Sequence, residues 1–179
     1  MSRHSGEDSP EAMSDVILIE GEVYGLRSEV TAINVRAGVA SLPSNCFMGC
    51  RNLTAVILPV SLRTINSHAF SGSNLKSIII PNGVLHIFDG AFSQCPSLET
   101  VILPNSVQSI GFSCFWGCVK LRSIGLPECF PVTAGIEKQA IIPLNAFANC
   151  ESLEHIVIPE VSYDLFIRIL ISPLEKHTN

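Results

Sequence analysis

A repeat of about 23 residues constrains this chain more than any other feature of its sequence. Leu53, Leu75, Leu98 and Leu121 each begin a similar unit, at successive intervals of 22, 23 and 23 residues. A fixed period of roughly 20 to 50 residues is typical of solenoids, in which one supersecondary unit is stacked along an axis. We therefore predict an elongated stack of coils, whose exposed faces favour binding over catalysis in a buried pocket.

Each unit places apolar residues at the same positions. With the leading Leu as zero, apolar residues recur at positions 3, 5, 9 and 12, Pro follows at position 6, and a small residue precedes Phe at position 17. Residues two apart in a strand point to the same side, so positions 3 and 5 would face the core from one short strand. Proline has no N–H for the ladder and would end that strand. The pattern predicts parallel strands and a column of aligned rings, formed by Phe70, Phe92, Phe115 and Phe147.

The same period predicts the domain organisation. A weaker copy of the unit begins at Val30, and another opens at Leu153 without finishing. We expect a β-rich, mainly parallel, right-handed leucine-rich solenoid of about five to six coils with terminal caps, because an open end would expose core and strand edges. The predicted segments are a disordered acidic tail (1–15), a degenerate capping repeat (16–29), the solenoid (30–159) with an insertion (128–141), and a C-terminal cap that could include a short helix (160–179).

Charge and hydropathy exclude two classes of partner. The formal net charge is −5, and residues 1–29 hold seven of the 16 acidic side chains, so the repeat region is close to neutral. A neutral surface lacks the basic footprint of a nucleic-acid-binding protein. No run approaches the ~18 apolar residues of a membrane span, and no apolar signal segment is visible. We expect a cytoplasmic protein if the chain is complete, and a cell-surface or secreted one if it is a fragment.

The cysteines and histidines do not predict a catalytic or metal site. Six of the seven cysteines fall in two repeat phases, as small buried residues would. The pairs Cys46/Cys50 and Cys114/Cys118 would lie three coils, or roughly 14 Å, apart, too far for one zinc ion. A disulfide between neighbouring coils is sterically allowed, but an odd cysteine count argues against a disulfide framework. With no converging histidines or paired carboxylates, we expect a protein that is not an enzyme and has no cofactor.

The middle residue of each strand suggests a binding surface. Apolar residues at this place would point outward in one line, interrupted at Asn34 and Gly125, although β-branched residues also simply favour strands. A contiguous apolar strip marks a partner or self-association surface. Charged neighbours would supply a polar rim, and the insertion, as in other solenoids, could contribute a loop to the binding face. The predicted contact residues are Ile57, Ile79, Ile102 and Val157 in the strip, Lys76, Glu99, Arg122 and His155 beside it, and Phe130 in the insertion.

The repeat unit, LxxIxIPxxVxxIxxxAFxxC, resembles the Treponema-type leucine-rich repeat of BspA-like proteins over residues 30–159. It departs from that pattern at Arg36, at Ser73 and in the insertion after Pro127. The resemblance implies a protein-interaction or adhesion module, often found on cell surfaces of bacteria and some protists. We therefore interpret the chain as a non-enzymatic interaction module that binds a protein partner, or itself, through the strand face and the insertion loop. The alternative is a fragment of a cell-surface adhesin that binds host matrix or glycan.

Overall fold

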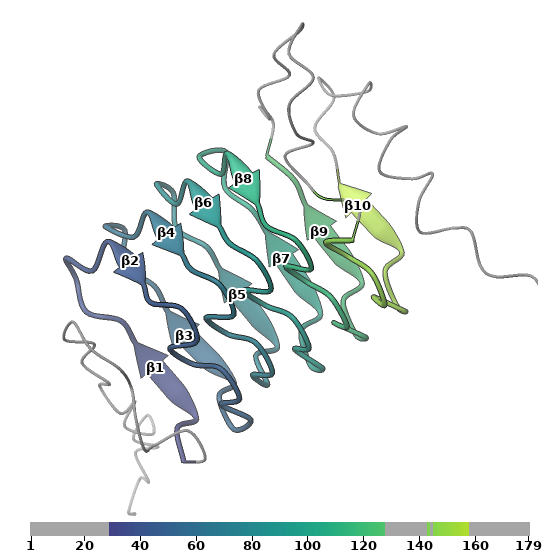
Figure 1. Ribbon diagram of the computed structural model, residues 1–179, viewed down its shortest axis with the longest axis horizontal. Helices are drawn as coiled ribbons and strands as arrows, with labels where there is room; N and C mark the ends of the chain where they lie inside the picture. Colours follow the sequence, from purple (N-terminus) through teal and green to yellow (C-terminus); the bar gives the residue numbers. More distant parts are fainter. Residues whose placement is uncertain (1–28, 128–142, 144, 158–179) are drawn as a thin grey trace, which may run out of the picture.

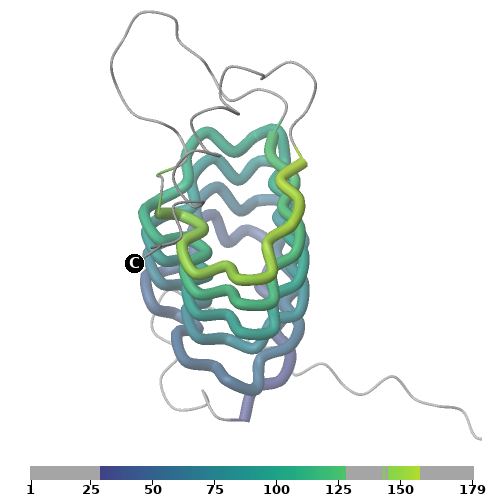
Figure 2. The backbone as a smooth tube through the Cα atoms, turned by 90° about the vertical axis from the view of Figure 1, so that its right-hand side faces the viewer, coloured from purple at the N-terminus to yellow at the C-terminus, as the bar shows by residue number. Residues whose placement is uncertain are grey.

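The computed structural model describes residues 29–127, 143 and 145–157, and these residues form a stack of coils built from short parallel strands (Figure 1). The predicted parallel β-solenoid is confirmed. Viewed from the end of the stack, successive coils lie almost directly over one another (Figure 2). The predicted acidic tail, nearly all of the capping repeat, the whole insertion and the C-terminal cap lie outside the described residues.

Each coil contributes a strand to one or both of two opposite faces. The wider face, here called the strand face, carries β1 (Ala32–Asn34), β3 (Ala55–Ile57), β5 (Ser77–Ile79), β7 (Thr100–Ile102), β9 (Ser123–Gly125) and β10 (His155–Val157). The other face carries the two-residue strands β2 (Ser41–Leu42), β4 (Thr64–Ile65), β6 (His86–Ile87) and β8 (Ser109–Ile110). All pairings are parallel. These shorter strands hold the apolar residue at position 12, which the sequence pattern predicted to turn inward but not to pair in a second sheet.

The strand face consists of two sheets, β1-β3 and β10-β9-β7-β5. The division falls after the one unit that is 22 residues long. In that unit only Asn74 separates Ser73 from Leu75, whereas two residues separate Cys95 from Leu98. The break in the strand face therefore coincides with the shorter link. The opposite sheet, β2-β4-β6-β8, runs without interruption through the same coils.

A column of stacked phenylalanine rings forms the centre of the core. Ring centroids of Phe47, Phe70, Phe92, Phe115 and Phe147 follow one another at 5.2, 5.3, 5.4 and 5.5 Å. Interplanar angles of 4° to 10° hold for the last three pairs. The predicted column is confirmed, and it fixes the register of the whole stack because each ring contacts the rings of the coils next to it.

One tight turn in each coil requires left-handed backbone. Gly49, Gly72 and Gly117 occupy the same place in three coils with φ of 73°, 70° and 71°. Gln94 occupies that place in the coil between them, with φ of 54°. Glycine reaches this conformation without steric cost, whereas a side chain with a Cβ does not. The turn at Gln94 is therefore a point of local backbone strain.

Candidate interaction surface

The strand face presents a line of exposed apolar side chains. Ile79 is 85% exposed and Ile102 is 73% exposed, although the residues just before them in each strand, Ile78 and Val101, are buried. This alternation follows from the two-residue period of a strand, which points neighbouring side chains to opposite sides. Ile57 and Val157, at the two ends of the line, are 52% and 58% exposed. The four predicted strip residues therefore point away from the core, and we call them the apolar strip: Ile57, Ile79, Ile102 and Val157.

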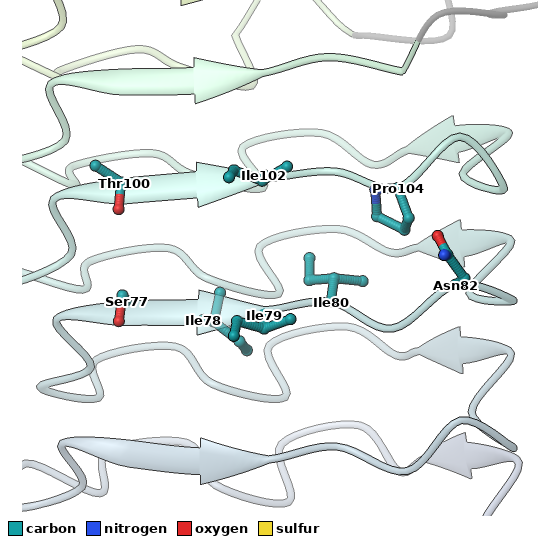
Figure 3. Close-up of a pocket in the computed structure, with 8 residues that line it drawn as sticks. All are labelled: Ser77, Ile78, Ile79, Ile80, Asn82, Thr100, Ile102 and Pro104. Carbon is teal, nitrogen blue, oxygen red and sulfur yellow. The ribbon is translucent and has the colours of Figure 1, made fainter.

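The strip includes one shallow groove and one gap. Ile79 and Ile102 lie side by side in register on β5 and β7, and with Ser77, Thr100, Asn82 and Pro104 they line a groove of about 380 Å³ (Figure 3). In β9 the strip position is Gly125, which pairs in register with Ile102 on one side and Val157 on the other. The strip is thus raised over β5 and β7, recessed at β9, and raised again at β10.

A row of charged residues runs beside the strip. Lys76, Glu99, Arg122 and Glu154 each directly precede a strand of the four-stranded sheet, and all four are exposed. Backbone hydrogen bonds join consecutive members: the N–H of Glu99 donates to Lys76 O at 2.9 Å, that of Arg122 to Glu99 O at 2.9 Å, and that of Glu154 to Arg122 O at 3.0 Å. The bonds hold the row at the spacing of the coils, with charge alternating in sign from coil to coil.

The remaining predicted residues lie elsewhere or are not described. His155 is exposed at the start of β10, where it pairs in register with Ser123, so it lies one residue further along the strand than the charged row. Phe130 lies outside the described residues. Four other large apolar side chains among the described residues are exposed and were not predicted: Val60 at 80%, Phe112 at 63%, Phe88 at 42% and Met48 at 39%. Val60 stands where the next two units have Asn82 and Asn105, and this out-of-phase placement is the signal that could have identified it.

The side chains nearest to a catalytic grouping have separate partners. His86 Nδ1 lies 2.8 Å from Ser109 Oγ on the neighbouring coil, whereas Asp89 Oδ1 accepts a hydrogen bond from the backbone N–H of Phe112 at 2.7 Å. His86 and Asp89 therefore do not act as a pair, although they are close in the sequence. Within the described part of the chain, no group of three or more His, Cys, Asp or Glu side chains could hold a metal ion.

The described cysteines form no disulfide and contribute to the core. Cys46, Cys50, Cys95, Cys114 and Cys118 are buried and Cys150 is partly buried. Thiols in successive coils donate to the carbonyl of a phenylalanine in the preceding coil, as from Cys118 Sγ to Phe92 O at 3.1 Å and from Cys150 Sγ to Phe115 O at 3.1 Å. Burial raises the pKa of the Cys114 thiol and raises the pKa of Cys150 to about 11. These thiols are protonated at neutral pH, and the nucleophilic thiolate is suppressed.

Three comparisons with known proteins place the chain. The model of the BspA type leucine rich repeat region matches residues 19–140 and 134–164, in six copies. The sequence matches none of the curated proteins. In the residues that the structure describes, there is no helix with the length and apolar character needed to span a bilayer.

Two solved structures share the architecture. A leucine rich repeat protein of T. pallidum is 31% identical, with a TM-score of 0.66, and the match covers 82% of this chain and 70% of that one. The pneumococcal vaccine antigen PcpA is 20% identical, with a TM-score of 0.63, and the match covers 82% of this chain but 35% of the antigen. The first supports a shared family, and the second shows a shared fold.

Proposed function

The chain belongs to the BspA-type leucine-rich repeat family, and from this premise we propose that it is an interaction module that binds another protein through its strand face. Leucine-rich repeat proteins of this kind generally mediate protein interactions and are generally not enzymes. The apolar strip would form the centre of the contact, and the charged row would form its rim.

One observation carries the proposal: the strand face exposes a large apolar side chain at the same place in β3, β5, β7 and β10. Ile79 and Ile102 are neighbours in register, and each exposes more than two thirds of its surface. Isolated exposed apolar residues are common on protein surfaces. A row of them with a polar edge, in contrast, has the composition of an interface core and its rim. The groove between β5 and β7 would receive an apolar side chain of the partner.

A second candidate is that the chain forms part of a larger surface protein that binds matrix or glycan. The observation in its favour is the sequence Asn52-Leu53-Thr54, an acceptor sequence for N-glycosylation, whose Asn52 is exposed in the turn before β3. Peptide mass spectrometry of the native protein would test this candidate. A glycan on Asn52 would place the chain in a secretory route, and an unmodified Asn52 removes the support for it.

The proposed function is tested by affinity capture followed by quantitative mass spectrometry. The bait is compared with the double variant Ile79→Asp, Ile102→Asp and with the double control Val60→Asp, Phe112→Asp, which puts the same two charges on exposed apolar residues outside the strip. We expect the strip variant to lose partners that the wild type and the control retain, with an unchanged circular dichroism spectrum. Capture of the same proteins by all three baits would refute the strand face as the contact surface.

A further inference from the structure

We propose that the strand face binds a second copy of this chain, in a two-fold symmetric dimer whose axis runs parallel to the strands between β7 and β9. The inference rests on the proposed function, because it uses the same surface, and it adds the identity of a partner. Its basis is the order of charges and of side-chain sizes across β5, β7, β9 and β10. A two-fold interface must be complementary to itself, and this surface meets that condition in one register.

The charged row is complementary to its own reverse. Along the stack it reads Lys76, Glu99, Arg122, Glu154. A two-fold axis parallel to the strands places the strand faces of two copies against each other and reverses the order of the coils. Each residue keeps its position along the strand direction, so residues of the charged row meet residues of the charged row. Lys76 then lies opposite Glu154 of the second copy, and Glu99 lies opposite Arg122 of the second copy. By symmetry all four members of each row face an opposite charge.

The apolar strip is complementary under the same operation. Ile79 lies opposite Val157 of the second copy, so two apolar side chains meet. Ile102, which is 73% exposed, lies opposite Gly125 of the second copy, where the strip is recessed. A Cβ added to Gly125 would come no closer than 3.7 Å to Ile102 of its own chain. The fold therefore leaves room for a side chain at this place, and in the dimer that room receives Ile102.

Other two-fold arrangements of the same face bring like charges together. An axis centred on β7 would put Glu99 opposite Glu99, and one centred on β9 would put Arg122 opposite Arg122. An axis parallel to the stack, with the rows superposed, would put every charge opposite its own copy. Like charges placed directly opposite are unfavourable. An axis between β5 and β7, or between β9 and β10, leaves part of the row opposite uncharged residues. Only the axis between β7 and β9 therefore places every charged residue of the row opposite a residue of the other sign.

The contact is small, so the dimer is weak. Four strands at ~4.8 Å, each contributing about five residues at ~3.3 Å, span roughly 300 Å² of projected area per copy. A stable interface usually buries about 800 Å² per partner. We therefore expect dimers at protein concentrations of roughly 100 µM and above, and weaker association at high salt because the exposed charge pairs are screened.

The test is a charge exchange in the full 179-residue chain, followed by sedimentation equilibrium from about 10 µM to about 1 mM. Glu99→Lys puts a lysine opposite Arg122 at two symmetric places, and Arg122→Glu puts a glutamate opposite Glu99 at two places. Each variant alone should dimerise at least about tenfold more weakly than the wild type. In an equimolar mixture, positions 99 and 122 of one variant face residues of opposite charge in the other variant. Heterodimers should therefore form. The controls Glu151→Lys and Arg51→Glu make the same charge changes in exposed turns between coils and should leave dimerisation unchanged.

Three results would overturn the dimer: a monomeric wild type at every concentration, single variants that associate as tightly as the wild type, or a mixture that stays monomeric. These results are separable from the fate of the proposed function. If the wild type is monomeric but the Ile79→Asp, Ile102→Asp bait still loses a specific partner, the strand face binds a different protein and only the self-association is wrong.

Discussion

Removing the ring of Phe92 should destabilise the solenoid by about 4 kcal/mol, because this ring is fully buried and stacks on both neighbours. Its centroid lies 5.3 Å from that of Phe70 and 5.4 Å from that of Phe115, with interplanar angles of 7° and 4°. A buried Phe→Ala change costs about 3 to 5 kcal/mol through lost transfer free energy and a residual cavity. The upper half of that range applies, since two aromatic contacts of about 0.5 to 1.5 kcal/mol each are also lost.

Urea unfolding of Phe92→Ala, followed by circular dichroism, measures this loss as a shift of the transition midpoint. Phe112→Ala is the matched control, because Phe112 is 63% exposed and its removal should change the free energy of unfolding by less than about 0.5 kcal/mol. A central coil contacts coils on both sides, so the Phe92 variant should also unfold less cooperatively. A loss below about 1 kcal/mol for Phe92→Ala, or an equal loss in both variants, would refute the stacked column as the main source of stability.

Two further predictions concern the turn at Gln94 and the buried thiols. Gln94→Gly should raise the free energy of unfolding by about 0.5 to 1 kcal/mol, because glycine adopts the positive φ without strain. The control Gln108→Gly, beside β8, should lower the free energy of unfolding by a similar amount. If thermal melts show that both variants shift the melting temperature in the same direction, the strain at Gln94 is refuted. The pKa of Cys150 is raised to about 11, so the unfolded chain releases this proton first, near the ordinary thiol value of about 8.5. The stabilising contribution of the thiol is therefore complete below about pH 8.5 and declines as pH rises towards 11. The pH dependence of urea midpoints should be shallower in Cys150→Ser, and identical slopes in the two proteins would be inconsistent with a buried, protonated thiol.

The sequence predicted those parts of the fold that depend on repetition. The leading Leu, the two inward strand residues and the Ala-Phe pair each recur in phase, so their burial and the ring column could be inferred without coordinates. The outward direction of Ile79 and Ile102 followed from the same alternation. Their contact role stays a prediction, because exposure shows only that a side chain is available.

The details that the sequence did not predict arise where one coil meets another. The break between β3 and β5 coincides with the one 22-residue unit, and the sequence shows that difference in length but not which strands pair across it. His86 pairs with Ser109, 23 residues away, rather than with the nearby Asp89. Val60 and Phe112 lie in turns, and the sequence pattern does not show how far such turn residues are exposed.

The sequence by itself determined the period, the inward positions and the parallel stack, because local alternation and a fixed repeat length leave few other ways to bury so many apolar residues. Only the tertiary structure decided that His86 meets Ser109 of the neighbouring coil and that the strand face divides between β3 and β5. The physical reason is that these relations join residues about one coil apart in the chain, and their alignment depends on the backbone hydrogen bonds that place each coil on the one before it.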